Sequence, residues 1–127
     1  MTPDTITSVT KLMEDYFEGL YQADSNRLRQ VFHPRLSYVC VTEGDELYLD
    51  LETYLSKVDK REPPAQRGEK RSDSILEISF GGVQMAHVKA QVSMLGRDYL
   101  DYLTLIRHGN GWRIVSKVFS YTPKEAE

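Results

Sequence analysis

The chain has 127 residues, of which 40% are hydrophobic and 28% charged, a composition typical of globular proteins. Its net charge of −3 argues against nucleic-acid binding, which usually requires a basic face. No apolar run approaches the roughly 20 residues that a membrane-spanning helix needs. We therefore expect neither nucleic-acid nor membrane partners, and one domain over residues 1–127 that is large enough for a hydrophobic core.

Cysteine content and the N-terminal sequence indicate a reducing compartment. Cys40 is the single cysteine, which excludes an intrachain disulfide and a thiolate metal site. No other set of side chains has metal-ligand spacing, and no phosphate-binding or dinucleotide-binding motif occurs, so no metal or cofactor is expected. The first residues lack the basic and apolar regions of a secretory signal, and we predict a cytoplasmic protein.

Two helices are predicted at the start of the chain. Residues 3–22 form an amphipathic helix, because apolar residues recur there at steps of three and four: Ile6, Val9, Met13, Tyr16, Phe17 and Leu20. Thr2 suits the N-cap of this helix. A second, short helix is capped by Asp24 or Ser25 and ended by Pro34, which disfavours helical angles at the residue before it.

The middle of the chain alternates between strand and helix. Residues 36–42 are rich in β-branched and aromatic side chains and predict a strand, with a possible short return strand at 46–49. Asp50 then caps a third helix over residues 51–60. Residues 61–71 combine proline, glycine and charge, which is typical of an exposed loop.

The C-terminal half predicts a β-meander. Alternating apolar and polar residues are separated by glycine-rich turns, which is the pattern of β-hairpins. The predicted strands are residues 74–80, 83–95, 97–107 and 112–119.

Turn positions decide which side chains share a face, because strand residues alternate between the two faces. Two-residue turns at Gly81-Gly82 and Gly96-Arg97 would pair Phe80 with Val83 and Val92 with Asp101. The core face would then hold Ala86, Val88, Ala90, Val92, Tyr99, Asp101, Leu103, Leu105, Trp112, Ile114, Ser116 and Val118. The outer face would hold His87, Lys89, Gln91, Tyr102, Thr104, Arg113, Lys117, Phe119 and Tyr121, a composition that suits a wet surface or a subunit interface.

Together, this element order and two local motifs resemble the nuclear transport factor 2-like superfamily, also called SnoaL-like or ketosteroid-isomerase-like. The motifs are Phe32-His33-Pro34, although Arg35 stands where Asp is common, and the ending Asp101-Tyr-Leu-Thr-Leu-Ile-Arg107 through Gly111-Trp-Arg-Ile-Val-Ser-Lys-Val-Phe119. The ending is similar to that of the small bacterial "putative lumazine-binding" branch.

The resemblance implies an α+β, cone-shaped fold in which N-terminal helices pack on a curved, mostly antiparallel sheet around a pocket. It also implies a homodimer through the outer sheet face, for which the residues are Tyr102, Lys117, Phe119 and Tyr121. Members of this superfamily include isomerases, dehydratases, cyclases and non-catalytic binders, so the fold alone does not define an activity.

Asp101 is the best candidate for chemistry, because it interrupts an apolar alternation on the predicted core face. Desolvation raises the pKa of a buried carboxyl group, so a protonated Asp101 could donate a hydrogen bond or act as a general acid. Alternatively, Asp101 bonds Ser116, Tyr99 or the backbone and only organises the strand. His33 could serve as the base, or the His-Pro pair could simply turn the chain.

Tyrosines on the apolar sides of their elements predict a ring-binding pocket, because buried tyrosine hydroxyls need polar partners. The predicted ligand-binding set is Tyr16, Tyr38, Tyr54, Tyr99, Asp101, Trp112 and Ser116. Three functions stay open: a binder of a small, mostly apolar organic ligand, a cofactor-independent isomerase or dehydratase using Asp101 and His33, and a dimeric interaction module with a vestigial pocket.

Overall fold

The computed structural model describes residues 3–124, so the predicted N-cap Thr2 lies outside the described residues. Within this range three helices pack on one sheet of six strands. The helices are α1 (Pro3–Gln22), α2 (Ser25–Val31) and α3 (Leu51–Asp59). The strands are β1 (Phe32–Cys40), β2 (Leu47–Leu49), β3 (Ser72–Phe80), β4 (Met85–Met94), β5 (Arg97–His108) and β6 (Gly111–Pro123).

Side-chain caps begin the two shorter helices where the sequence predicts them. Asp24 accepts a hydrogen bond from the backbone N–H of Arg27 at 3.0 Å, and Asp50 accepts one from that of Thr53 at 2.9 Å. Each carboxylate satisfies a backbone donor that the first helical turn leaves free. β1 begins four residues earlier than predicted, because Phe32 already pairs with β6.

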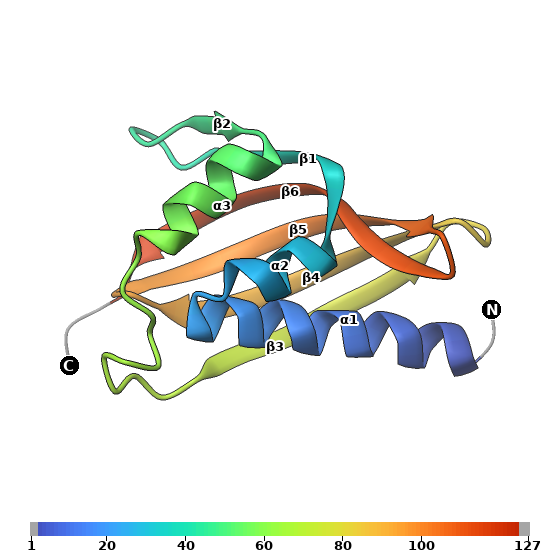
Figure 1. Cartoon of the computed structure of the whole chain (residues 1–127), viewed down its shortest axis with the longest axis horizontal. Helices are drawn as coiled ribbons and strands as arrows, with labels where there is room; N and C mark the ends of the chain where they lie inside the picture. The colour runs from blue at the N-terminus through green and yellow to red at the C-terminus, as the bar shows by residue number, and fades with distance from the viewer. Residues whose placement is uncertain (1–2, 125–127) are drawn as a thin grey trace.

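The strand order is β2-β1-β6-β5-β4-β3, and all neighbours are antiparallel except β1 and β6. Figure 1 shows the three helices in front of one face of this curved sheet. The hydrophobic core lies between the helices and that face. The predicted α+β cone is therefore confirmed. No helix within residues 3–124 is long and apolar enough to cross a bilayer.

The turn between β4 and β5 lies one residue earlier than predicted. Leu95 and Gly96 form it, with φ angles of 54° and 77°, and type I′ hairpin turns require positive φ at both central positions. Val92 consequently pairs with Tyr99 instead of Asp101. The observed pairing of β4 with β5 differs from the predicted pairing by two residues. A shift of two residues keeps every side chain on the same face of the sheet, so the predicted faces of β4 and β5 are correct.

The turn between β3 and β4 is longer than predicted. Phe80 pairs with Ala86, and the prediction that it pairs with Val83 is wrong. The backbone N–H of Gly81 donates to the carbonyl of Met85 at 2.9 Å, which closes a wider loop than the Gly-Gly pair alone would form.

A β-bulge in β6 reverses the predicted alternation. Ile114 pairs with Leu105 and Ser116 pairs with Thr104, which leaves Val115 as an extra residue without a partner on β5. An extra residue of this kind rotates every following side chain to the opposite face.

Several face assignments in β6 are therefore wrong. Lys117 and Phe119 are 4% and 5% exposed and face the core, whereas Val118 is 37% exposed. By the same alternation Tyr121 shares the inner face with Phe119, and Ser116 turns away from it. Of the four residues predicted for the dimer interface, Tyr102 alone lies on the outer face.

Candidate functional site

A hydrogen bond between helix α1 and strand β5 lies at the centre of the fold. The hydroxyl of Tyr16 donates to Oδ2 of Asp101 at 2.5 Å, and both residues are almost fully buried. Burial first, and then the Asp101 carboxyl group, raise the pKa of Tyr16 well above 10.0, so its hydroxyl keeps the proton and acts as a donor. The second carboxyl oxygen, Oδ1, has no hydrogen-bond partner in the part of the chain that the structure describes.

Lys117 brings a buried amine into the same region. Its Nζ lies 5.0, 5.2, 5.3 and 5.9 Å from the ring centroids of Phe119, Tyr16, Tyr38 and Tyr54. Within residues 3–124 this amine has neither a hydrogen bond nor an ion pair, so the faces of the rings are its main contacts. Burial lowers the pKa of Lys117 below its ordinary value of 10.5, and Asp101 partly opposes that effect.

Strand register brings Asp101 and Lys117 to the same patch of the inner face. Asp101 is paired with Phe119, and Lys117 stands two residues before Phe119 on the same side of β6. Diagonal neighbours of this kind on adjacent strands are about 7–8 Å apart, a span that long side chains reach. The carboxyl group and the amine consequently line one cavity.

That cavity has a volume of about 20 Å³. A cavity needs roughly 10–15 Å³ to hold one water molecule, so there is room for one water-sized group. Among residues 3–124 the buried Tyr54 hydroxyl has no hydrogen bond of normal geometry. Burial raises the pKa of Tyr54 to about 12, and the nearby guanidinium of Arg61 partly opposes that effect. The lining residues are Leu20, Tyr38, Tyr54, Arg61, Val92, Met94, Tyr99, Asp101 and Lys117.

Aromatic rings pack closely around this cavity. The rings of Tyr38 and Tyr54 are stacked, with centroids 4.3 Å apart and planes at 26°, and Tyr99 is tilted against Phe119 at 6.0 Å. Five of the predicted ligand-binding residues are thereby brought together: Tyr16, Tyr38, Tyr54, Tyr99 and Asp101.

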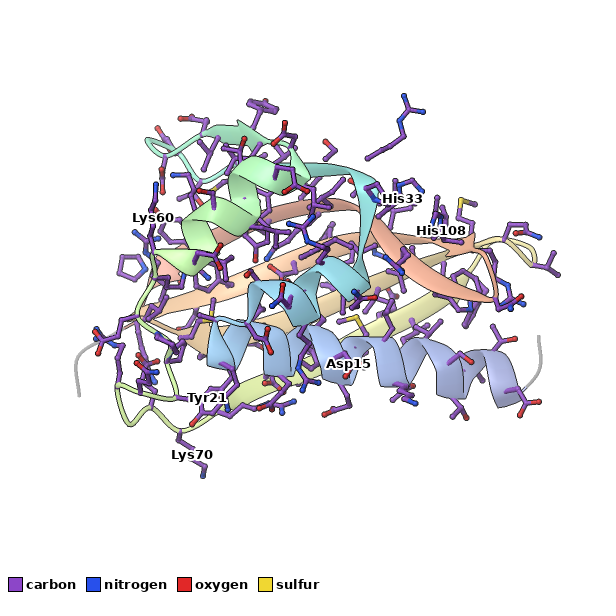
Figure 2. All side chains as sticks on the ribbon, in the orientation of Figure 1. Asp15, Tyr21, His33, Lys60, Lys70 and His108 are labelled. Atoms are coloured by element: carbon purple, nitrogen blue, oxygen red, sulfur yellow. The ribbon has the colours of Figure 1, made fainter. Side chains whose placement is uncertain are left out.

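His33 lies elsewhere. Its ring packs against His108 at 4.8 Å, and its Nδ1 accepts a hydrogen bond from the backbone N–H of Arg35. Figure 2 shows His33 and His108 side by side at one end of the molecule, and Lys60, which adjoins the cavity residue Arg61, at the opposite end.

The strand register gives the same separation between His33 and Asp101. Cys40 of β1 pairs with Phe119, which pairs with Asp101, and His33 stands seven positions before Cys40. Seven strand residues span roughly 20 Å. His33 and Asp101 therefore do not share a cavity, and the structure gives no support to their pairing as acid and base.

Trp112 and Ser116 also lie away from the cavity. Trp112 is buried against Phe80, with ring centroids 6.1 Å apart, and Arg107 lies over its ring at 5.3 Å. Ser116 is turned to the other face by the bulge and pairs with Thr104, so it is not the partner of Asp101.

Two residues of the site, Lys117 and Arg61, are not predicted from the sequence. Unbroken alternation through β6 places Lys117 on the outer face. The adjacent apolar residues Ile114 and Val115 interrupt that alternation and were the available signal. Arg61 belongs to a predicted loop, and no local pattern indicates that it lines the cavity.

The family profile described as "Putative lumazine-binding" matches residues 4–120, and the chain belongs to this family. Within residues 3–124, no cluster of three or more His, Cys, Asp or Glu side chains could hold a metal ion.

Several solved structures share the fold. An NTF-2-like protein of unknown function from Silicibacter pomeroyi is 26% identical, with a TM-score of 0.84 over 96% of this chain and 100% of its own. One from Shewanella baltica is 19% identical, with a TM-score of 0.85 over 98% and 99%. A cystatin-like domain of unknown function from Nostoc punctiforme is 12% identical, with a TM-score of 0.75 over 99% and 81%. A comparison with curated proteins gives no match.

We predict that Tyr16→Phe destabilises the fold by about 1–3 kcal/mol, because it leaves both oxygens of the buried Asp101 without a donor. Tyr54→Phe is the matched control, since it removes a hydroxyl that has no partner, and its effect should be much smaller. Urea unfolding followed by circular dichroism measures both. Equal losses for the two variants would contradict this role of the Tyr16 hydroxyl.

We also predict that Lys117 makes stability depend on pH. Because its pKa is lowered in the folded chain, the unfolded chain binds more protons at this site between the folded-state pKa and about pH 10.5, and stability rises with pH in that window. As the pH is raised toward about 10.5, the unfolding free energy of wild type should therefore rise relative to that of Lys117→Met.

Urea titrations at several pH values measure this difference. The exposed Lys57→Met serves as the control and should follow the wild-type profile. Parallel profiles for Lys117→Met and wild type would show that Lys117 has an ordinary pKa in the folded protein.

Proposed function

We propose that this protein binds a small, mostly apolar organic molecule in the interior of the cone, with a carbonyl group placed against Lys117. The observation that carries the proposal is a set of polar groups around one cavity. Oδ1 of Asp101 and the Tyr54 hydroxyl are buried without a hydrogen-bond partner among residues 3–124, and the Lys117 amine lies over aromatic rings beside them. Leaving such groups buried without partners costs free energy, which a ligand with matching groups would recover.

The chemistry of the lining favours a neutral, planar ligand. Tyr38, Tyr54 and Tyr99 offer ring faces and edges on which a flat molecule could stack. A carbonyl oxygen would accept from Lys117, whereas a carboxylate would also meet the carboxyl group of Asp101. The family description names lumazine, a planar heterocycle that carries carbonyl groups and fits this chemistry.

Binding would require the cavity to widen, because its present volume admits about one water-sized group. The side chains best suited to move are Arg61, which is half-buried, and Met94, whose unbranched side chain adapts readily to new shapes. Both line the cavity, and their displacement would not disturb the bond between Tyr16 and Asp101.

We expect lumazine to bind, with Lys117→Met weakening its affinity at least about tenfold through loss of a charge-assisted hydrogen bond. Titration of the protein into lumazine, followed by ligand fluorescence, measures the affinity. Lys57→Met, on the exposed face of α3, should bind as wild type does. Saturation-transfer NMR with lumazine on both variants separates weak binding from none, and absence of binding to wild type would refute lumazine as the ligand.

We further propose that two copies associate through the outer face of the sheet. A groove of about 270 Å³ lies there, and it is lined by uncharged residues: Val41, Leu100, Tyr102, Val118 and Ser120, together with Phe119, whose side chain faces the core. Tyr102 and Val118 are 47% and 37% exposed. Since the groove carries no charge, a twofold axis could bring the same patch of two copies together without repulsion.

For this interface we expect Val118→Asp to yield monomers, because it would place like charges opposite each other at the twofold contact. Multi-angle light scattering during gel filtration measures the mass. Val83→Asp introduces the same charge at a residue that is 78% exposed in the β3–β4 loop, and it should leave the dimer intact. A wild-type protein that elutes as a monomer at micromolar concentration would refute the interface.

A further inference from the structure

Asp101 and Lys117 are the buried charged residues of the described range. Asp101 has an evident structural partner, because Tyr16 donates to it. Lys117 has none: its amine makes no hydrogen bond or ion pair within residues 3–124 and is surrounded by aromatic rings. Stability alone would favour an apolar residue at such a position, which makes the retained amine a candidate for chemistry.

We propose that Lys117 is a nucleophile that forms a Schiff base with the carbonyl group of an aldehyde or ketone bound in the cavity. The proposal rests on the proposed function, since it assigns a covalent step to the same site. Three features of the geometry support it: the amine lines a cavity, it is not held by a counter-ion, and a carboxyl oxygen without a partner lines the same cavity. Desolvated lysines of this kind are known to be activated as nucleophiles.

The neutral form of the amine is the reactive one, and its surroundings favour that form. Burial lowers the pKa of Lys117, and the charge of Arg61 at the same cavity lowers it further. An aromatic enclosure still stabilises the protonated amine in part, so both forms remain accessible. The amine is consequently able to lose its proton before attack and to take one up afterwards.

The reaction balances without an oxidant or reductant. The lone pair of Nζ attacks the carbonyl carbon, and the π electrons move to the oxygen, which takes a proton and becomes a hydroxyl group. The nitrogen gives up one proton to complete that hydroxyl group, which yields a neutral carbinolamine. The nitrogen electron pair then expels the hydroxyl group, which takes up the proton that the ammonium group released before attack and leaves as water. The products are a protonated C=N bond to Lys117 and one water molecule.

Asp101 is placed to move the protons in this sequence. Its Oδ2 is occupied by Tyr16, whereas Oδ1 is unpartnered and can accept the proton lost by the nitrogen and return it to the leaving hydroxyl group. Tyr16 acts as a positioning residue, because its hydrogen bond fixes the orientation of the carboxyl group toward the cavity. The volume of about 20 Å³ admits one water-sized group, so the cavity must widen to take a carbonyl compound, as for the ligand proposed above.

Reductive trapping tests the proposal. Folded protein is incubated with propanal and cyanoborohydride near pH 7, and peptide mass spectrometry follows the gain of one propyl group at each lysine. We expect Lys117 to be modified at least about tenfold faster than the exposed Lys57, because its lowered pKa increases the fraction of neutral amine near pH 7. In Lys117→Arg, which keeps the charge, this fast modification should vanish while Lys57 reacts as before.

Arg61→Lys separates access from reactivity, because it shortens the side chain that lines the cavity and keeps the positive charge that lowers the pKa of Lys117. Lys117 should therefore react faster with propanal in this variant than in wild type. If Lys117 reacts no faster than Lys57 in both wild type and Arg61→Lys, the nucleophile proposal is overturned. The fold of each variant is checked by circular dichroism before labelling.

The lumazine titration distinguishes the two proposals at this site. Lumazine binding without selective trapping of Lys117 would leave the binding function standing and overturn the Schiff base. Selective trapping without lumazine binding would support the nucleophile and require a different ligand.

Discussion

The single extra residue in β6, Val115, is the constraint on which the interior of this protein depends. Without it, strict alternation would send Lys117 and Phe119 to the outer face and bring Ser116 and Val118 inward. The neighbouring strand β1 is also irregular beside the bulge: its pairing with β6 shifts register between Phe32 and Ser37. Pro34 falls within that irregular stretch, where its missing N–H breaks no ladder hydrogen bond.

The bulge places an amine next to a carboxyl group in an aromatic interior, an arrangement that an apolar core would avoid. Its cost is limited by Tyr16, which crosses from α1 to satisfy one oxygen of Asp101, and by the rings that surround Lys117. Among residues 3–124, Oδ1 of Asp101 and the Tyr54 hydroxyl are left without hydrogen-bond partners and belong to residues that line the same small cavity, whereas the third such group, Nε1 of Trp112, lies away from it. Incomplete satisfaction of a buried polar network is unusual in a purely structural core and is common where a ligand or a reaction completes it.

The two ends of the sheet carry different groups of side chains. One end carries the aromatic cavity, whose lining includes Arg61. The other end carries the His33–His108 pair, which Figure 2 shows far from Lys60, the neighbour of Arg61 in the sequence. The chain belongs to the family described as "Putative lumazine-binding". Membership in a family of this fold does not define an activity, which depends on individual side chains. The side chains that distinguish this protein are therefore Lys117 and Asp101 at the aromatic cavity, together with the uncharged groove of the outer face.

The sequence by itself determined the element order, the caps Asp24 and Asp50, the buried stripe of α1 and the burial of Asp101. These features are local: they follow from periodicity, from cap chemistry and from alternation within one strand. Tertiary structure alone decided the face of Lys117, the separation of His33 from Asp101 and the inclusion of Arg61 in the cavity. Each depends on register across neighbouring strands or on contacts between distant segments, and one unpaired residue is enough to reverse a face without changing the local pattern that predicts the strand.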